Sequence, residues 1–278
     1  MERAAGPEKN LAQFYLALLD AEDKDGLLAA PAARPETFPS AAREKWQTGR
    51  PALTIIPLEI PAEELFQRLL AVVRACLQWQ PGPQILPADL LPALQILPAA
   101  ARKEFCAALA AGFPPDEKCR WAAKFGITPE MLDFLACHTL RPCLRRYGEA
   151  LAGELNFDEW GRGSCPVCGG APTMARISAG DGARKLYCSR CETEWRYKRI
   201  GCPYCGNEDA GSLSFLEVAG YEQYRLYLCE ACRSYLKTVD ERKTDGATDL
   251  FCADLVTARL DRLAADEGYR RAGTGAQS

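Results

Sequence analysis

Four Cys-x-x-Cys pairs follow one another in the second half of this chain, and they carry most of the chemistry that the sequence can do. Thiolates at this spacing bind soft metal ions, and four of them together make a tetrahedral site. The order of the pairs predicts one site made by the first two pairs and another made by the last two. The eight ligands are Cys165, Cys168, Cys188 and Cys191 for the first metal ion, and Cys202, Cys205, Cys229 and Cys232 for the second.

A four-sulfur site suits zinc or a single iron ion, and the spacing does not choose between them. His138 is the one histidine in the 278 residues, so mixed cysteine and histidine sites are excluded except through that residue. We expect His138 to pack or to cap within a helix. The cysteines outside the pairs have no ligand spacing: Cys76, Cys106, Cys119, Cys137, Cys143 and Cys252.

The pairs also form an internal repeat. The run Cys165-Pro-Val-Cys-Gly matches Cys202-Pro-Tyr-Cys-Gly, and each is followed, after a length of chain suited to a β-hairpin, by a second pair. The glycines Gly169 and Gly206 supply the positive φ that a tight turn around a metal needs. This pattern predicts two tandem ribbons joined by residues 192–201, and a link so short should pack the ribbons against each other.

Other interpretations of the cysteine pairs fit the sequence less well. A disulfide framework needs an oxidising compartment, whereas the N-terminus carries no export signal, which favours the cytoplasm. A thioredoxin-like redox pair stands alone beside a βαβ unit, unlike four pairs among short β-type runs. Purely structural metals stay open as an interpretation, because structural zinc contributes roughly 10–16 kcal/mol of apparent binding free energy to folding.

Composition excludes several classes of protein. The formal net charge is -3 and 48% of the residues are apolar, so no global field draws the chain to nucleic acid or to anionic lipid. The longest apolar runs are too short to span a bilayer. The sequence has no Gly-rich phosphate loop and no Ser/His/Asp set, and we expect no catalytic turnover. The basic and aromatic run 195–199 suits single-stranded nucleic acid, but Glu192 and Glu194 flank it.

The elements that position the cysteines are predicted from periodicity and from start and stop residues. Residues up to about 155 have helical spacing. Pro61 opens a helix with an apolar stripe from Leu65 to Leu77, and further helices are expected over 99–111 and 116–125. Thr128-Pro129 begins another helix, in which Pro142 predicts a kink or break. Three prolines predict loop or extended chain over residues 41–60.

The pattern changes after Trp160. Short β-type runs alternate with the cysteine pairs at 185–188, 195–200, 213–218 and 224–228, and helical spacing returns after Gly246. The expected fold is α+β, with a mostly helical N-terminal domain, two tandem four-cysteine ribbon modules and a C-terminal helix. The expected divisions are 1–160, 161–200, 201–243 and 244–270, with a disordered tail at 271–278.

These motifs together resemble a known family. The runs 164–172, 186–199, 202–207 and 224–240 are similar to the formate dehydrogenase accessory protein family, FdhE, and the match closes over residues 249–269. The specific part of the resemblance covers residues 160–270, and the eight ligand positions follow the family pattern without departure. The helical N-terminal region fits in its length and in its proline-broken start.

The resemblance implies a function that spacing alone does not. Members of the family are cytoplasmic and are needed for active respiratory formate dehydrogenase, whose catalytic subunit carries molybdenum or tungsten. They are thought to bind that subunit before membrane targeting, as assembly factors with no stable membrane insertion of their own. By this resemblance the eight paired cysteines hold iron in rubredoxin-like modules, and the surface of the ribbons docks the client.

Three functional hypotheses follow. The first is a binding protein, a maturation chaperone for formate dehydrogenase without a reaction of its own. The second is a rubredoxin-like redox protein, and the third is a zinc ribbon that binds nucleic acid. For the first hypothesis, the expected partner contacts are aromatic and basic residues of the ribbons. These are Trp195, Arg196, Tyr197, Lys198, Arg199 and Tyr204.

Overall fold

The computed structural model describes residues 13–20, 38–79 and 86–272. The chain divides into two compact units, one of Met1–Arg34 and Leu58–Arg146, the other of Pro35–Pro57 and Tyr147–Ser278. The limits of these units differ from the domain boundaries predicted from the sequence, and those boundaries stay a prediction. Residues 273–278 of the predicted disordered tail lie outside the described residues.

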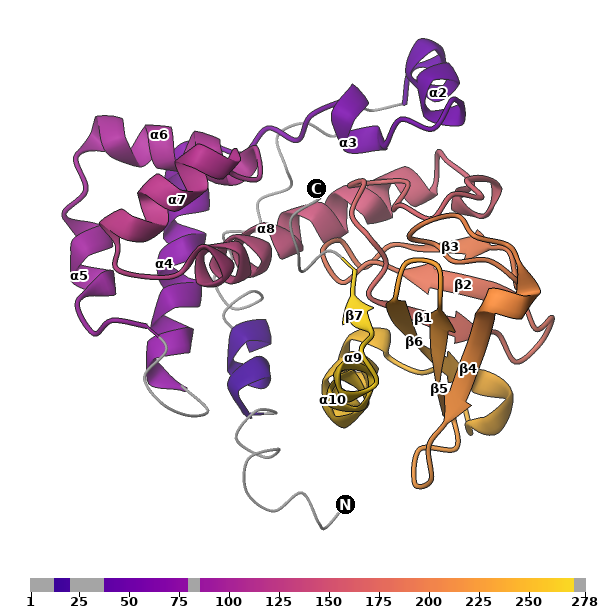
Figure 1. Ribbon diagram of the computed structural model, residues 1–278. Helices are drawn as coiled ribbons and strands as arrows, with labels where there is room; N and C mark the ends of the chain where they lie inside the picture. The colour runs from indigo at the N-terminus through magenta and orange to yellow at the C-terminus, as the bar shows by residue number, and fades with distance from the viewer. Residues whose placement is uncertain (1–12, 21–37, 80–85, 273–278) are drawn as a thin grey trace. The chain divides into compact units, whose positions relative to one another are not determined.

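The first unit is helical (Figure 1). Its helices include residues 13–20, α4 (Ala62–Gln78), α5 (Leu90–Gln95), α6 (Ala99–Ala110) and α7 (Pro115–Lys124). The predicted apolar stripe of α4 is buried through Leu65, Phe66 and Leu69. The ring of Phe105 on α6 packs edge-on against Trp121 on α7, with centroids 4.9 Å apart. The helix predicted to open at Pro61 and the helices predicted over 99–111 and 116–125 are therefore confirmed.

Helix α8 (Pro129–Ala152) begins in the first unit and ends in the second. It starts as predicted, because the Thr128 hydroxyl accepts a hydrogen bond from the Met131 N–H at 3.2 Å. The helix continues through Pro142, so this proline does not end it. In the described ranges, no helix is both long enough and apolar enough to cross a membrane.

The expectation of loop or extended chain over residues 41–60 is wrong for much of that segment. Two helices form there, α2 (Ser40–Gln47) and α3 (Ala52–Ile55). Pro39 and Pro51 stand immediately before the first helical residues, where a missing N–H costs nothing. These prolines begin helices, whereas the sequence pattern had suggested that proline breaks them.

A single sheet organises the second unit. Its strands are β1 (Met174–Ile177), β2 (Arg184–Tyr187), β3 (Glu194–Tyr197), β4 (Leu213–Glu217), β5 (Tyr224–Cys229), β6 (Ser234–Asp240) and β7 (Arg270–Arg271). The order is β3-β2-β1-β6-β5-β4, and β7 pairs with the start of β6. The four predicted β-type runs are confirmed as β2 to β5, whereas β1, β6 and β7 were not expected.

The two predicted ribbons are halves of this sheet. Neighbouring strands are antiparallel within β1 to β3 and within β4 to β6, whereas β7 pairs with β6 in parallel. The two halves are joined by β1 and β6, which are parallel, with Met174 opposite Lys237 and Ile177 opposite Asp240. The expectation that a short link packs the ribbons together is confirmed, and it is met by backbone pairing as well as by side chains.

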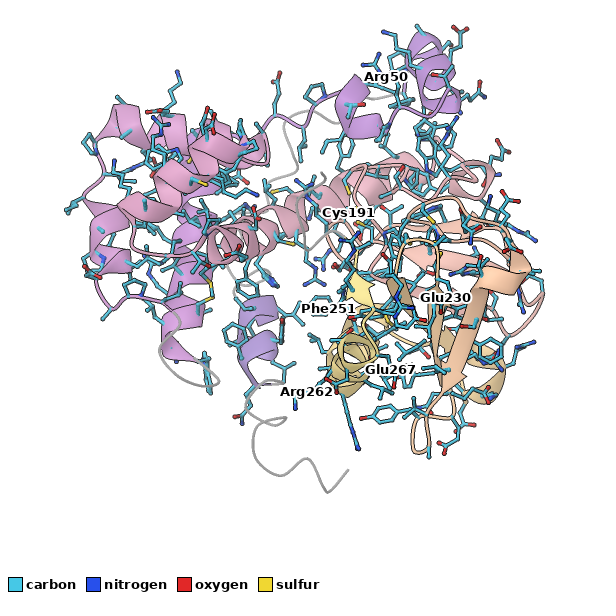
Figure 2. The ribbon with its side chains drawn as sticks, in the orientation of Figure 1. Arg50, Cys191, Glu230, Phe251, Arg262 and Glu267 are labelled. Atoms are coloured by element: carbon cyan, nitrogen blue, oxygen red, sulfur yellow. The ribbon has the colours of Figure 1, made fainter. Side chains whose placement is uncertain are left out.

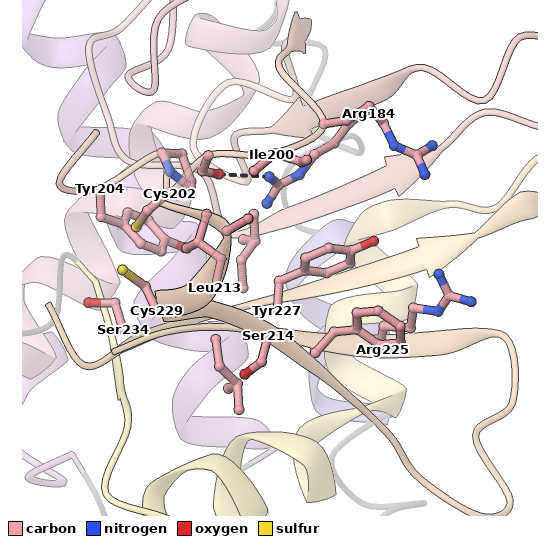
Figure 3. Close-up of a pocket in the computed structure, with 17 residues that line it drawn as sticks. Arg184, Ile200, Cys202, Tyr204, Leu213, Ser214, Arg225, Tyr227, Cys229 and Ser234 are labelled. Carbon is pink, nitrogen blue, oxygen red and sulfur yellow. Dashed lines mark hydrogen bonds between the residues drawn. The ribbon is translucent and has the colours of Figure 1, made fainter. Parts of the chain in front are cut away.

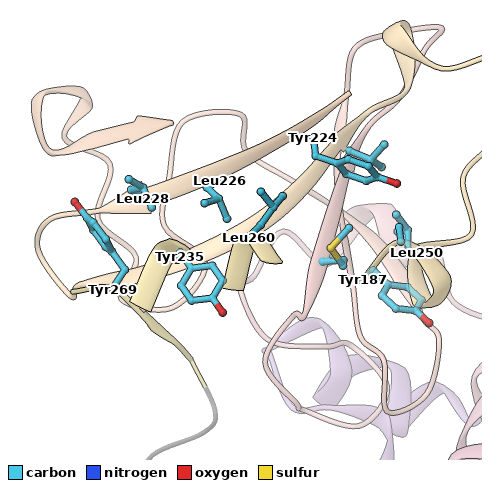
Figure 4. Packing of buried hydrophobic residues seen from close by; sticks show 12 residues of the cluster. Tyr187, Tyr224, Leu226, Leu228, Tyr235, Leu250, Leu260 and Tyr269 are labelled. Atoms are coloured by element: carbon cyan, nitrogen blue, oxygen red, sulfur yellow. The ribbon is translucent and has the colours of Figure 1, made fainter. Parts of the chain in front are cut away.

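The core of this unit lies between the sheet and two helices, α9 (Leu250–Val256) and α10 (Ala258–Asp266) (Figure 4). Tyr187 of the first half, Leu226 and Tyr235 of the second, and Leu250 and Leu260 of the helices are all buried in one cluster. The single C-terminal helix expected over 244–270 is therefore two helices followed by β7. Helices beside a mixed sheet confirm the α+β class.

A buried cation fixes the helices to the sheet. Lys237 in the middle of β6 has no exposed surface, and its ammonium lies 2.6 Å from Asp254 Oδ1 and 2.7 Å from Asp261 Oδ2. Asp261 also accepts a hydrogen bond from the Tyr235 hydroxyl at 2.7 Å. The opposite face of α10 is solvated, and Arg262 there points away from the sheet (Figure 2).

Candidate metal centres

The first two cysteine pairs meet beside the N-terminal end of β1. Cys165 and Cys168 precede that strand, and Cys188 and Cys191 follow β2, so the hairpin brings the two turns together. The Sγ atoms of Cys165 and Cys191 are 3.4 Å apart, and those of Cys168 and Cys188 are 3.5 Å apart. All four sulfur atoms lie within 4.8 Å of one another.

The last two pairs meet in the same way in the other half of the sheet. Cys202 and Cys205 lie before β4, whereas Cys229 ends β5 and Cys232 lies in the turn to β6. The Sγ atoms of Cys202 and Cys232 are 3.6 Å apart, and those of Cys205 and Cys229 are 3.7 Å apart. The structure thus groups the eight cysteines four and four, in the combination that the sequence predicts.

The sulfur spacing fits a shared metal ion. Metal–sulfur bonds of about 2.3 Å in a tetrahedron place neighbouring sulfurs about 3.8 Å apart. A disulfide would need a sulfur–sulfur distance near 2.05 Å, and none of the fourteen cysteines forms a disulfide. The donor set therefore suits zinc or a single iron ion, with one ion in each group and no protein ligand of another kind.

The turn that carries each pair has one special backbone position, the residue after the second cysteine. Its φ is +76° at Gly169, +56° at Glu192, +75° at Gly206 and +53° at Arg233. In the first and third turns a hydrogen bond closes the loop, from Gly169 N to Cys165 O and from Gly206 N to Cys202 O, both 3.0 Å. The two non-glycine positions were not anticipated from the sequence.

The segment before α4 supports the first group, and nothing in the sequence pattern indicated this contact. The backbone N–H groups of Ala52 and Leu53, at the start of α3, donate to the carbonyls of Pro166 and Val167 at 2.9 Å each. The Trp46 indole N–H donates to the Pro166 carbonyl at 3.1 Å. The N–H groups in the first turn of α3 have no acceptor within that helix, and they thereby satisfy the carbonyls of the first cysteine turn.

The two groups differ in their access to solvent. In the first group Cys165, Cys188 and Cys191 are buried and Cys168 is half-buried. In the second group Cys205 is exposed and Cys232 is half-buried. The two centres are alike in ligands and in turn geometry, but the second is the more exposed of the two.

One cysteine of each group has a lowered pKa, whereas burial and the neighbouring sulfur atoms raise the pKa of Cys165, Cys188, Cys202 and Cys205. Hydrogen bonds from Cys165, Cys188 and Cys191 hold the pKa of Cys168 well below its usual range. At Cys229 burial acts to raise the pKa, but the Cys232 N–H and the Asn207 amide outweigh it and lower the pKa to about 7. The Asn207 amide nitrogen lies 3.8 Å from that sulfur.

The cysteines outside the pairs belong to neither group. Burial raises the pKa of Cys76 to about 12 and that of Cys106 to about 11, so both are inert thiols in the helical unit. Cys119 and Cys252 are exposed. His138 is buried, and its ring lies 4.5 Å from that of Phe134, so it packs within its helix as expected.

The residues predicted to contact a partner fall into two sets. Trp195 and Tyr197 are buried in the sheet, where the Trp195 indole donates to Arg162 O at 2.8 Å and the Tyr197 hydroxyl donates to Cys202 O at 3.2 Å. Their rings are therefore buried, whereas the prediction had assumed that they lie on the surface.

The other four residues are accessible in part or in full. Arg196, Lys198 and Arg199 are exposed, and Tyr204 is half-buried with its hydroxyl donating to Pro172 O at 3.1 Å. Arg196 pairs with Asp181 and Lys198 pairs with Glu208, both across open surface. Partner contact by these residues stays a prediction.

The sheet and both sulfur groups lie in residues that are similar to one protein family. Residues 164–199 match the model of the FdhE central domain, and residues 200–276 match that of the FdhE C-terminal domain. An FdhE homolog of Aquifex aeolicus (strain VF5) is 33% identical over 147 residues, which are 52% of this chain and 51% of that protein.

Two further relatives extend the comparison. Protein FdhE of Escherichia coli (strain K12) is 34% identical over 110 residues, 38% of this chain and 35% of that protein. The chain thus spans only about half or a third of the length of these curated relatives. The crystal structure of the FdhE protein from Pseudomonas aeruginosa covers 97% of this chain and 92% of its own, with a TM-score of 0.59 and 23% identity, and shows the same fold.

Residues 164–276 of this chain therefore match the central and C-terminal domains of the FdhE family, one after the other.

Proposed function

We propose that this protein is a non-catalytic accessory factor that binds the molybdenum- or tungsten-containing subunit of a respiratory formate dehydrogenase in the cytoplasm, during its assembly. The observation that carries this proposal is the coincidence of the two FdhE domains with the sheet and both four-sulfur groups. Four-cysteine centres on a paired sheet give a rigid platform, which is what recognition of a large folded client requires.

In this proposal each sulfur group holds one ion, iron or zinc, through its four cysteines. The ion would link the two turns of a hairpin whose own core is small, and it would fix the loops that lie beside it. The exposed side chains of the turns would make the contact with the client. They keep one fixed arrangement as long as the two turns at the end of the hairpin are held together.

The proposed contact surface lies around the second group. Cys205 is exposed there, Lys198 and Arg199 are exposed in the preceding link, and Ile200 is 58% exposed. Arginine is enriched at protein interfaces, and an exposed apolar patch rimmed by polar side chains is typical of an interaction site. The buried Trp195 and Tyr197 would act from beneath, by holding the backbone of this link in place.

Capture of the dehydrogenase subunit from the native host tests the proposal. The variant C202S/C205S should lose one metal ion and lose capture, whereas C252S, which removes an exposed cysteine outside both groups, should retain two ions and full capture. Undiminished capture by C202S/C205S, after metal analysis has shown loss of the second ion, would sink the proposal.

A second set of variants separates the surface from the metal. Reversing the charges of Lys198 and Arg199 to Glu should weaken capture while leaving both ions bound, because these side chains are not ligands. The same reversal at Lys103 and Arg120, both exposed on the helical unit, serves as the matched control, because Arg120, like Lys198, is in a surface ion pair. Equal capture by both double variants would place the contact elsewhere.

The exposure of Cys205 also favours a second candidate, electron transfer through the second centre. That function needs iron, because zinc has no accessible redox change. Anaerobic purification followed by metal analysis and a visible spectrum is the test, and a colourless protein with two zinc ions would exclude this candidate.

A further inference from the structure

A pocket lies beside the second sulfur group, within the second unit (Figure 3). Its volume is about 290 Å³, near the lower end of the range for small-molecule sites. Strands β4 and β5 form one wall and the link before Cys202 forms another. The side chains that matter most are Arg184, Ile200, Leu213, Phe215, Arg225 and Tyr227.

Arg184 is the only wholly buried cation among these lining residues, with 2% of its surface exposed. It comes from β2 in the first half of the sheet and reaches toward the Cys202 turn in the second (Figure 3). Its Nη1 donates to the Gly201 carbonyl at 2.9 Å, and the guanidinium lies 4.9 Å from the centre of the Tyr227 ring. Its Nε–H has no hydrogen-bond partner.

The lack of a counter-charge sets Arg184 apart. In the described part of the chain it makes no ion pair, whereas buried Lys237 faces two aspartates and buried Arg68 pairs with Glu64 at 2.9 Å. Arg225, at the same pocket, is paired with Glu217 at 2.9 Å. A buried cation without an anion is costly, and a guanidinium does not escape that cost by losing its proton.

The lining of the pocket limits what the missing anion can be. Most of the lining surface is apolar and includes Leu213, Phe215 and Tyr227, and the Phe215 and Tyr227 rings lie 5.7 Å apart. A small inorganic anion would compensate the charge of Arg184 but would leave this apolar surface in contact with water. A planar carboxylate matches the donor geometry of a guanidinium, and an apolar body attached to it would fill the remaining volume.

We propose that this pocket binds an organic carboxylate, with its carboxylate on Arg184 and its apolar body against Leu213, Phe215 and Tyr227. The carboxylate can belong to a free aromatic or branched acid, or to the end of a peptide chain that finishes in an apolar residue. This assignment does not rest on the proposed function or on the identity of the metals.

Calorimetry on the full-length, metal-loaded protein at pH 7 tests the charge and the body separately. Benzoate should bind, benzamide should bind at least about tenfold more weakly because it lacks the charge that Arg184 requires, and acetate should also bind more weakly because it lacks the ring. Equal binding of benzoate and benzamide, or no binding of benzoate at millimolar concentration, overturns the proposal.

Variants then assign the site. Arg184→Gln should weaken benzoate binding by roughly 10- to 100-fold, and Leu213→Ala should weaken benzoate but not acetate. Arg196→Gln removes an exposed arginine from the neighbouring strand, outside the pocket, and should leave binding unchanged. If Arg184→Gln fails to fold, the comparison of benzoate with benzamide and the Leu213 variant still decide. Benzoate affinity that survives both substitutions overturns the assignment.

The two sources of the carboxylate are separated with a short peptide. A capped peptide that ends in phenylalanine with a free carboxylate is compared with its C-terminal amide and with benzoate. Tighter binding of the peptide acid supports the site and assigns it to a chain terminus, whereas tighter binding of benzoate supports the site and assigns it to a free acid. An amide that binds as tightly as the acid contradicts the proposal.

Discussion

The four residues that follow the second cysteine of each pair show how far single residues are predictable. Two of them are glycines, and Gly169 and Gly206 revealed their positive φ in the sequence. Glu192 and Arg233 adopt the same backbone conformation, but nothing in their chemistry shows it. The repeat of the turn was the available clue, because equivalent positions in a repeat adopt equivalent φ.

Replacement at these positions should change stability in opposite directions. Glu192→Gly removes the strain of a side chain in the left-handed region and should raise the free energy of unfolding by up to about 1 kcal/mol. Gly206→Ala introduces that strain, although no atom lies near enough to clash with the new Cβ, and should lower the free energy of unfolding by about 1–2 kcal/mol. Denaturant unfolding of the metal-loaded variants measures both, and a loss of stability in Glu192→Gly would contradict the argument.

The burial of Trp195 and Tyr197 shows a second limit at the scale of the residue. A strand alternates its faces, so these two rings share one side of β3 and Arg196 lies on the other. The alternation was present in the sequence and indicated one buried face. Which face would be covered depends on distant chain, here the residues around Arg162, and no local pattern contains that information.

At the scale of elements, local patterns predicted the hairpin strands and missed the strands that join them. Strands β2, β3 and β5 carry clear β-type runs, whereas β6 has Lys237 at its centre and reads as polar. The parallel pairing of β1 with β6 links residues far apart in the chain. Such pairing depends on tertiary packing, which periodicity does not encode.

The charge network around Lys237 should be essential to the packing of α9 and α10. Lys237→Met leaves Asp254 and Asp261 to share the guanidinium of Arg271, so one carboxylate charge is uncompensated and the free energy of unfolding should fall by roughly 3–5 kcal/mol. The further change Asp254→Asn removes the excess negative charge and should recover part of the loss. A double variant less stable than Lys237→Met alone would show that these charges do not act as a unit.

Close approach of the two halves of the sheet depends on a glycine. A Cβ atom at Gly163 would lie 1.8 Å from the carbonyl oxygen of Pro203, in the third cysteine turn. Gly163→Ala should therefore cost about 1–3 kcal/mol, because backbone on both sides must shift. Gly153→Ala is the matched control, since no atom lies within 4 Å of its Cβ position. Thermal unfolding of both proteins distinguishes the two cases, and equal midpoints would argue against this contact.

At the scale of the whole molecule, the sequence predicted the ligands and the class of fold but not the inequality of the two centres. The pairs look alike in the sequence, and their difference in exposure comes from residues 38–57, which lie far from the first pair in the chain, and from the end of α8. Gly148 of α8 illustrates this cover, since a Cβ there would lie 2.9 Å from Thr193 Oγ1.

This inequality predicts stepwise loss of metal. A chelator should remove one equivalent quickly from the exposed group of Cys202, Cys205, Cys229 and Cys232, and the second equivalent only as the sheet opens. A time course of metal release with C205S as reference measures this, because that variant should lack the fast phase. Release of both equivalents at one rate would contradict the assignment.

The parallel pairing of β1 and β6 has a consequence for dissecting the gene. The two domain models meet between residues 199 and 200, which invites expression of either part alone. Cutting there would separate partners in mid-sheet and expose the backbone edge of β6, a strand whose side chains are buried along its whole length. The unpaired strand edge of each fragment would then pair with other copies of the same fragment and cause aggregation. Soluble protein should be obtained only when the two fragments are co-expressed.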